Sequence, residues 1–246
     1  MIQRLSRYPR NRQPELMDQP DLPDGIHRNA LIGLARLNRM TGIAGSMYRQ
    51  LVRCALHSGR NTLRVLDVAS GSADLPIAWA KRAKLSGLRL EMSTLEISGF
   101  AIEQQLRHAN RANVSLNPIQ QDCLNGNLPG GFDVITNSLF LHHLDEADTT
   151  RLLQKLVAAA GQRVVVCDLE RSRLNLGLVI AGAQLVSRSH VVHHDAIRSV
   201  QGAYTLQEFR YLATRAIDAP VAARRILPCR FMATLPASKA CQPGLN

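Results

Sequence analysis

Small residues at the end of an apolar strand are the clearest chemical signal in this sequence. The run Val65–Val68 is apolar apart from Asp67, and Ala69–Ala73 are all small residues, with Gly71 at their centre. A helix is expected to begin at Asp74. Small side chains let a ligand approach the backbone, and the first N–H groups of a helix are free to bind it. The pattern predicts a nucleotide-type site at the carboxyl end of the first strand of an α/β sheet.

Acidic and polar residues follow the next expected strands in an order that suits such a site. Glu96 ends the second strand, Asp122 follows the third, and Asn137 ends the fourth. A carboxylate at the end of a strand can accept both hydroxyls of a ribose, and a second acid can accept the amino group of adenine. A nicotinamide site would also use an acid after the second strand. It would need three spaced glycines as well, whereas this turn contains only Gly71.

Together these features resemble the class I S-adenosylmethionine-dependent methyltransferases, especially the branch that acts on quinone and phenol precursors. The resemblance covers about Leu63 to Leu235 and is sharpest over 66–75, 95–98 and 132–143. It implies S-adenosylmethionine as cofactor and S-adenosylhomocysteine as product. The residues expected to bind the cofactor are Asp67, Ala69, Gly71, Glu96, Ile97, Asp122, Cys123, Asn137 and Ser138. The family usually has glycine where this chain has Ala69 and Ala73, which leaves a non-catalytic partner subunit as an alternative.

Histidines supply the candidate bases. His193 and His194 precede Asp195, and His143 closes the segment after the fourth strand. Histidine titrates near physiological pH and can take a proton from a hydroxyl group. We expect His193 or His194 to act as the base, oriented by Asp195, with His143 as a further candidate. Imidazole and carboxylate groups also bind metals, but adjacent residues rarely converge on one ion, so no metal is expected.

The elements that must position these residues are those of a seven-stranded Rossmann-like methyltransferase sheet, mostly parallel with an antiparallel last strand. Strands are expected over 63–68, 88–96, 114–119, 132–137, 163–168, 221–226 and 230–235. Residues 1–60 predict an irregular basic arm, with one short turn at 14–17, followed by a helical cap. Residues 61–246 predict the methyltransferase domain. Within it, the segment of about 170–203 is expected to form an apolar lid over the acceptor before the sixth strand.

The residues at the tip of the fourth strand limit which kinds of methyl acceptor are possible. Relatives that methylate amino groups carry two prolines there, and this chain has Asn137-Ser138-Leu139-Phe140 instead. Methylation of cytosine carbon needs a cysteine near that strand, and none is present. The apolar lid favours O-methylation of a small phenolic or polyketide-like metabolite, as in secondary metabolism. C-methylation of a quinone-type precursor remains an alternative.

Composition sets the remaining limits. The net charge of +11 comes mostly from arginine, with local density at Arg4, Arg7, Arg10 and Arg12. An RNA-binding or RNA-modifying protein that uses this arm is therefore a rival hypothesis, although no nucleic-acid motif accompanies the charge and such a partner is disfavoured. Five scattered cysteines indicate reduced thiols, and no apolar run is long enough for a transmembrane segment. We expect a cytoplasmic enzyme and leave its oligomeric state open, a homodimer included.

Overall fold

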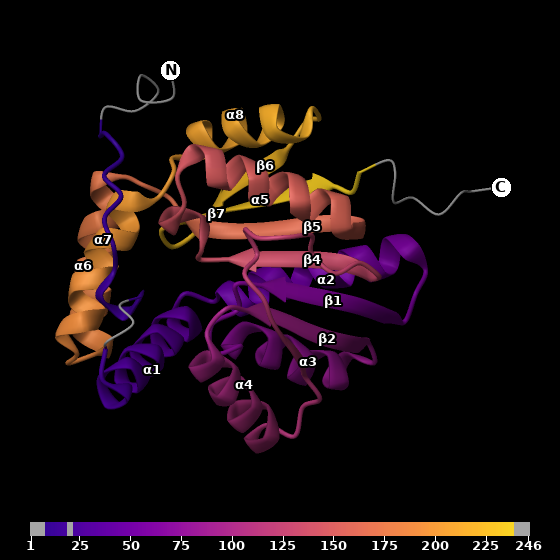
Figure 1. The fold of residues 1–246 in the computed structure, drawn as a ribbon, viewed down its shortest axis with the longest axis horizontal. Helices are drawn as coiled ribbons and strands as arrows, with labels where there is room; N and C mark the ends of the chain where they lie inside the picture. The colour runs from indigo at the N-terminus through magenta and orange to yellow at the C-terminus, as the bar shows by residue number, and fades with distance from the viewer. Residues whose placement is uncertain (1–7, 19–21, 239–246) are drawn as a thin grey trace.

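The computed structural model describes residues 8–18 and 22–238, which form one seven-stranded sheet flanked by helices (Figure 1). The helices are η2 (Leu16–Asp18), α1 (Asp24–Met40), α2 (Ile43–Ser58), α3 (Asp74–Ser86), α4 (Gly99–Arg111), η3 (Leu141–His143), α5 (Glu146–Ala159), α6 (Arg173–Val186), α7 (His190–Gly202) and α8 (Leu206–Ile217). The strands are β1 (Thr62–Val68), β2 (Arg89–Glu96), β3 (Asn117–Gln120), β4 (Phe132–Ser138), β5 (Ala160–Leu169), β6 (Ala222–Ile226) and β7 (Arg230–Pro236).

The strand order is β3-β2-β1-β4-β5-β7-β6, and β7 runs antiparallel to both of its neighbours while the other pairs are parallel. The predicted sheet is thereby confirmed. The three residues between β6 and β7 are too few for a crossover, which fixes this pair as a hairpin.

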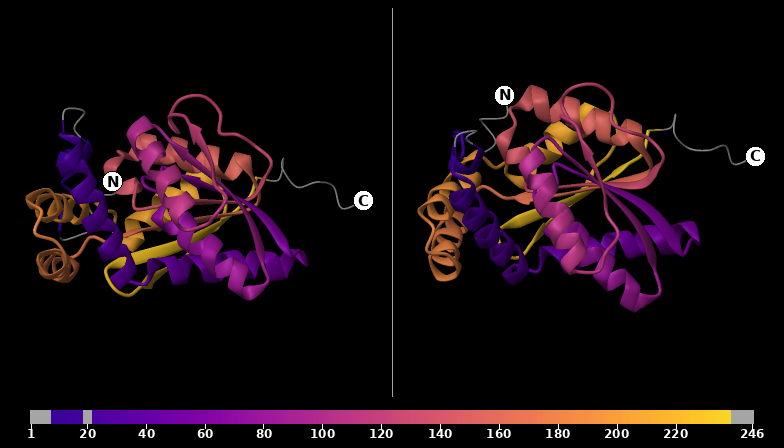
Figure 2. Two further views of the ribbon diagram at one scale, coloured as in Figure 1. Left: turned by 90° about the horizontal axis from the view of Figure 1, so that it is seen from below. Right: turned by 60° about the horizontal axis from the view of Figure 1, so that its bottom comes forward.

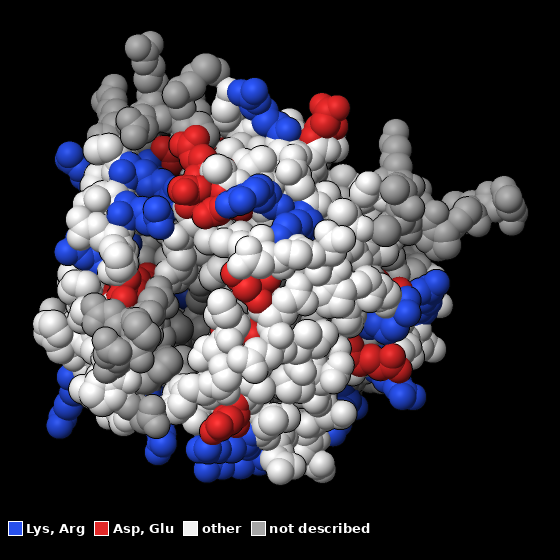
Figure 3. All heavy atoms as spheres, viewed as in Figure 1, with Lys and Arg blue, Asp and Glu red and all other residues white. Residues whose placement is uncertain are grey.

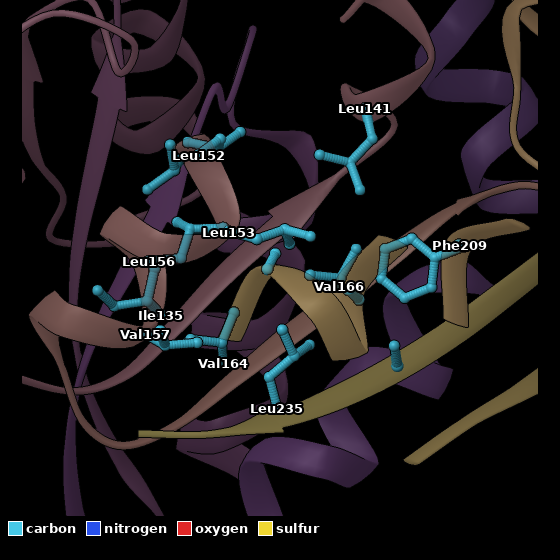
Figure 4. Packing of buried hydrophobic residues seen from close by; sticks show 14 of the residues in the cluster. Ile135, Leu141, Leu152, Leu153, Leu156, Val157, Val164, Val166, Phe209 and Leu235 are labelled. Atoms are coloured by element: carbon cyan, nitrogen blue, oxygen red, sulfur yellow. The ribbon is translucent and has the colours of Figure 1, made fainter. Parts of the chain in front are cut away.

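Two hydrophobic clusters cover the two faces of the sheet. Leu66 and Val68 of β1 point to the face packed by α5 and α8, and Leu63 and Val65 point to the face packed by α2 and α3. This alternation follows from the two-residue period of a strand. Figure 4 shows the first cluster, in which leucines of α5 and Phe209 of α8 pack on β4, β5 and β7. The sheet therefore has both faces buried, as expected for a mostly parallel sheet.

The capping residues behave as their types predict. Ser98 accepts a hydrogen bond from Ala101 N at the start of α4, and Thr205 forms a capping box with Glu208 at the start of α8. The third strand begins later than predicted, at Asn117 rather than at 114. The reason is that Val114 N donates to Ala109 O and so closes the end of α4 instead of pairing with β2.

The cap and the lid lie together beyond one end of the strands. The segment 170–203 forms two helices, α6 and α7, which pack on each other and on α1. Figures 1 and 2 show these three helices side by side, set apart from the helices that cover the faces of the sheet. No helix in residues 8–18 and 22–238 combines the length and the apolar character needed to span a membrane.

The turn after β1 adopts a left-handed backbone at three alternating positions. Ala69, Gly71 and Ala73 have φ values of 55°, 52° and 58°. A residue with a Cβ atom is disfavoured in this region by about 1–2 kcal/mol, so the two alanines store strain that glycine would not. The small residues of this turn are therefore required by the backbone path as well as by space for a ligand.

We expect Ala69→Gly to leave the free energy of unfolding unchanged or to raise it by up to ~1 kcal/mol. Relief of the left-handed strain offsets the extra freedom that glycine gives to the unfolded chain. The matched control is Ala78→Gly within α3, which should lose about 1 kcal/mol because its backbone is helical. Urea unfolding of both variants measures the difference, and an equal loss in the two would contradict the assigned strain.

Candidate active site

A cleft of about 700 Å³ opens where β1, β2 and β4 end. Its walls come from the turn after β1, the end of β2, the loop after β3, the segment after β4, and the cap. It collects six of the nine residues that the sequence predicts to bind the cofactor, namely Ala69, Gly71, Glu96, Ile97, Asp122 and Cys123. Phe100, Leu139, Phe140 and His143 line it as well.

Glu96 joins the end of β2 to the turn after β1. Its Oε2 accepts a hydrogen bond of 2.8 Å from Gly71 N, and its Oε1 accepts from Ile97 N at 2.9 Å and Ser98 N at 3.0 Å. The carboxylate is 9% exposed and lines the cleft. These backbone donors hold its two oxygens in a fixed orientation, with acceptor capacity left for a ligand.

Asp122 organises the loop after β3. Its Oδ1 accepts from Leu124 N at 2.8 Å, and its Oδ2 accepts from Asn125 Nδ2 at 2.6 Å. Cys123 beside it is buried, and burial together with the Asp122 carboxylate raises the pKa of its thiol to about 12. Cys123 is therefore a neutral, apolar wall of the cleft at physiological pH.

The other three predicted cofactor residues are not among those that line the cleft. Asp67 is 1% exposed and accepts a 2.6 Å hydrogen bond from Thr136 Oγ1. Burial, with the nearby carboxylates of Asp74 and Glu96, raises the pKa of Asp67 to about 7. Asn137 is fully buried and donates to Val68 O at 2.9 Å, which leaves its Oδ1 without a partner. Ser138, the last residue of β4, is half-buried.

A second space of about 320 Å³ lies between the cap, the lid and the ends of β5 and β7. Most of its wall is apolar and comes from α1, α6 and α7. Met17, Leu139 and His143 line both this cavity and the cleft. The two spaces therefore meet at His143, which is the arrangement expected of a reaction centre between a cofactor and an acceptor.

His142 is a fixed cation beneath this junction. Its Nδ1 donates to Asp168 Oδ1 at 2.7 Å, and its Nε2 lies 3.5 Å from Glu15 Oε1. Burial alone would lower the pKa of His142, but the Asp168 and Glu15 carboxylates outweigh it and raise the pKa to about 10. His142 is thus protonated at neutral pH and is not a free base.

His143 is placed differently from His142. Its Nε2 lies 4.0 Å from Glu15 Oε1, and its imidazole is 23% exposed, with its ring 4.3 Å from that of His142. Asp168 fixes the turn that carries both histidines, because its Oδ2 accepts from Phe140 N and Leu141 N. Of the predicted bases, His143 is the one that reaches the junction of the two spaces.

The structure does not bring His193 and His194 into either space. His193 Nε2 lies 2.7 Å from Ser187 O within the lid. His194 Nδ1 lies 2.9 Å from Asp195 Oδ1, and its ring stacks on His190. Asp195 itself lines the cavity and accepts from two backbone N–H groups of the arm, at 2.8 and 3.0 Å. In this geometry His193 ties α7 to the residues just before it, and His194 contacts the carboxylate that holds the arm.

The described part of the N-terminal arm crosses the lid and delivers Glu15 to the cavity. Arg10 donates to Leu144 O at 2.7 Å and stacks on the Tyr204 ring at 3.7 Å. Arg12 donates to His143 O at 3.1 Å. These two arginines serve intramolecular contacts, whereas Arg4 and Arg7 lie outside the described residues. On the face drawn in Figure 3, basic side chains are interspersed with acidic ones, and this face lacks the continuous basic stripe typical of nucleic-acid binding.

Glu15, His142 and His143 each place one potential ligand atom within 4.8 Å of the others, close enough to share a metal ion. Coordination would require His142 Nε2 to be unprotonated. Asp168 and Glu15 instead hold this imidazole in its charged form. Binding of a metal ion at His142 Nε2 would therefore first require loss of that proton.

Sequence reasoning missed three charged residues of the cavity region. Asp168 ends a predicted strand, as Glu96 does, so its position was a usable signal. Glu15 lies in the short turn predicted at 14–17, but nothing local indicates where that turn docks. Arg230 begins β7 and lines the cavity. Arg230 reaches Asn38 of α1 because the β6–β7 hairpin brings it there. The periodicity of the sequence does not show where that hairpin lies in space.

Comparison with known proteins agrees with this geometry. Residues 65–162 match the family model described as a methyltransferase domain. A search of the curated proteins gives no significant match. Among solved structures, the plantazolicin methyltransferase BpumL, in complex with a monoazolic desmethylPZN analog and S-adenosylhomocysteine, superposes with a TM-score of 0.66 at 14% identity. The match covers 88% of this chain and 91% of that one.

Two further solved structures are similar. Magnesium protoporphyrin IX methyltransferase from Synechocystis, with bound S-adenosylhomocysteine, gives a TM-score of 0.55 at 14% identity over 90% of this chain and 91% of that one. A candidate O-methyltransferase from Nostoc punctiforme gives a TM-score of 0.60 at 19% identity over 83% of this chain. This chain spans only 59% of the length of the Nostoc protein.

The strand order and the cleft define a class I, Rossmann-like methyltransferase fold. Residues 65–162 match a methyltransferase domain, and similar structures bind S-adenosylmethionine or S-adenosylhomocysteine, so S-adenosylmethionine is the cofactor expected of this domain.

Proposed function

We propose that this protein catalyses O-methylation of a small, largely apolar phenolic acceptor, with His143 as the general base. One observation carries the proposal: His143 lines both the cofactor cleft and the apolar cavity. The cavity of about 320 Å³ suits a single small molecule. Among the similar structures, one methylates mitomycin at an oxygen according to its name, which agrees with this chemistry at the level of the fold.

The cleft residues suggest how the cofactor would be held. Glu96 would accept the ribose hydroxyls, and Asp122 would accept the adenine amino group, with Ile97 and Cys123 beside the ring. Gly71 and Ala69 would allow close approach of the methionine part, while Asp67 would accept its ammonium group directly or through water. Asn137 and Ser138 would support the turn from β4.

When bound, S-adenosylmethionine supplies a methyl group on a positively charged sulfur. The protein's own residues then have two tasks. The cap and lid exclude water and align the acceptor hydroxyl, because an in-line displacement depends on alignment and desolvation. His143 would take the proton of the acceptor hydroxyl at the oxygen that receives the methyl group. The Glu15 carboxylate, 4.0 Å from His143 Nε2, stabilises the imidazolium that results.

Binding of S-adenosylhomocysteine is expected to depend on pH through Asp67. The pKa of this carboxyl is raised to about 7, and only its ionised form attracts an ammonium group. Below pH 7, binding must therefore release a proton. Affinity should rise about tenfold per pH unit up to pH 7 and then level off. Calorimetric titrations between pH 5.5 and 8.5 test this, and Asp67→Asn should flatten the profile. A profile that is already flat in the unmodified protein would remove Asp67 from the cofactor site.

Product analysis tests the function itself. Purified protein is incubated with S-adenosylmethionine and a panel of phenols, and products are identified by mass spectrometry. An aryl methyl ether supports the proposal, whereas a ring-methylated product favours C-methylation of a quinone-type precursor. Absence of any product together with no binding of S-adenosylhomocysteine would favour the alternatives of a non-catalytic partner subunit or an RNA-binding protein.

A further inference from the structure

The acceptor cavity contains a buried cation without an opposite charge in contact. Arg230 lines the cavity and is 6% exposed. Its Nη2 donates to Asn38 Oδ1 at 3.4 Å and its Nη1 to Pro228 O at 3.5 Å, both long bonds, and its Nε has no partner. A guanidinium carries five N–H donors, so most of its capacity is unused. No carboxylate of the described residues forms an ion pair with it.

The carboxylates around the cavity accept hydrogen bonds from groups other than Arg230. Asp195 accepts from two backbone N–H groups of the arm, and Glu15 accepts from Ser199 Oγ and faces His142. Asp168 attracts Arg230 from a distance. Both oxygens of Asp168 are nevertheless occupied, Oδ1 by His142 and Leu169 N, and Oδ2 by two N–H groups of the following turn. Arg230 is thus the charged group of the cavity that still needs a partner.

A buried charge without a partner is strongly unfavourable, and a structure retains one where a ligand completes the pair. We propose that Arg230 binds a carboxylate of the methyl acceptor, so that the substrate is an aromatic hydroxy acid rather than a neutral phenol. This inference rests on the proposed function. One guanidinium balances one negative charge, which suits a carboxylate better than a phosphate dianion.

The position of Arg230 indicates that the acid anchors the substrate and is not itself methylated. Arg230 is absent from the residues that line the cofactor cleft. It lies on β7 opposite Leu169, and β4 and β5 separate β7 from β1. Neighbouring strands are about 4.8 Å apart, which places β7 roughly 14 Å from β1. The acid would therefore lie at the β7 side of the cavity, while the hydroxyl reaches His143.

Asn38 links Arg230 to Asp74 through hydrogen bonds, so the proposed anion site belongs to a buried hydrogen-bond network. Its Nδ2 donates to Asp74 Oδ2 at 3.3 Å, which turns its Oδ1 toward Arg230. Asn38 is 4% exposed, so neither group is free to swing into solvent. The contact holds the guanidinium in place from one side and leaves part of the donor capacity of each Nη unused.

The test compares acids with their neutral amides. Calorimetry at saturating S-adenosylhomocysteine measures binding of hydroxyaryl acids, beginning with para-hydroxyphenylacetate, and of each corresponding amide. The unmodified protein should bind the acids about tenfold to a hundredfold more tightly. Arg230→Gln should abolish this preference without changing affinity for S-adenosylhomocysteine. The matched control is Arg224→Gln on the exposed side of the same hairpin, which should retain the preference.

Thermal unfolding gives a second readout that does not depend on finding a ligand. Arg230→Met removes the unpaired charge, so the ligand-free protein should melt a few degrees higher. A structural arginine would instead give a lower melting temperature, and that result overturns the proposal. Equal binding of acids and amides by the unmodified protein, or a methyl ester as product, overturns it too.

Failure of this inference and failure of the proposed function give different results. Acid binding that depends on Arg230 without any methyl ether product would contradict the O-methylation alone. Methylation of neutral phenols at the same rate by the unmodified protein and by Arg230→Gln would contradict the anion site alone.

Discussion

His143→Gln should lower kcat by about 10²–10⁴-fold while leaving the affinity for S-adenosylhomocysteine within a factor of about three. The loss is the usual contribution of a positioned general base, and glutamine keeps a similar size without a group that can accept the proton. Cofactor affinity should persist because His143 lies at the junction with the acceptor cavity rather than beside the ribose or adenine contacts. Steady-state kinetics with the best phenolic acceptor measures kcat, and calorimetry measures the affinity.

The pH profile separates a base from a residue that merely shapes the cavity. A base must take up the proton of the acceptor hydroxyl, so His143→Gln should change how kcat depends on pH, whereas loss of a residue that only shapes the cavity should lower kcat equally at every pH. His194→Gln is the matched control, since His194 contacts Asp195 in the lid and lines neither space. If His194→Gln loses turnover and His143→Gln does not, the base lies in the lid.

The fold follows from local sequence signals to a large extent. Alternating apolar strands, the Ser98 cap and the Thr205 capping box set most element positions, and all seven predicted strands are present. These signals are local because hydrogen bonds and burial periodicity within a few residues decide them. The start of β3 was mispredicted, since Val114 is apolar in either setting and only the contact with Ala109 places it at the end of α4.

The candidate site likewise has one part that the sequence could predict and another that it could not. The residues lining the cofactor cleft lie at strand ends, and the topology of a parallel sheet brings strand ends together, so Gly71, Glu96 and Asp122 could be predicted from order alone. The residues around the acceptor cavity could not be predicted in this way. Glu15 is delivered by an arm whose path depends on contacts with Asp195, which lies about 180 residues further along the chain.

The lid histidines show why residue type is a weaker guide than position. Three histidines next to an acid in one short segment are an attractive chemical pattern. In α7, however, the side chains of His193 and His194 turn to Ser187 O and Asp195, while Val191 and Val192 pack into the core of the lid. The helical period therefore places Val191 and Val192 on the face that packs against the arm and α1, and it leaves His193 and His194 off that face.

Glu96→Ala should weaken binding of S-adenosylhomocysteine by at least about 100-fold. Two hydroxyl groups that donate to one carboxylate form charge-assisted hydrogen bonds, each worth about 1.5–3 kcal/mol, and the variant loses both. It also leaves the N–H groups of Gly71, Ile97 and Ser98 without their acceptor, so the turn after β1 loses its tie to β2. Calorimetric titration measures the affinity, and thermal unfolding reports how much of the loss reflects the turn.

A conservative variant and a matched control separate these two effects. Glu96→Gln keeps the side-chain length, but its amide group places donors against one of the backbone N–H groups, so affinity should still fall markedly. Glu91→Ala changes an exposed acid on the same strand that pairs with Arg89, and it should bind S-adenosylhomocysteine as the unmodified protein does. Retention of tight binding by Glu96→Ala would mean that the ribose is held elsewhere, and the assignment of the whole cleft would have to be revised from β2 outward.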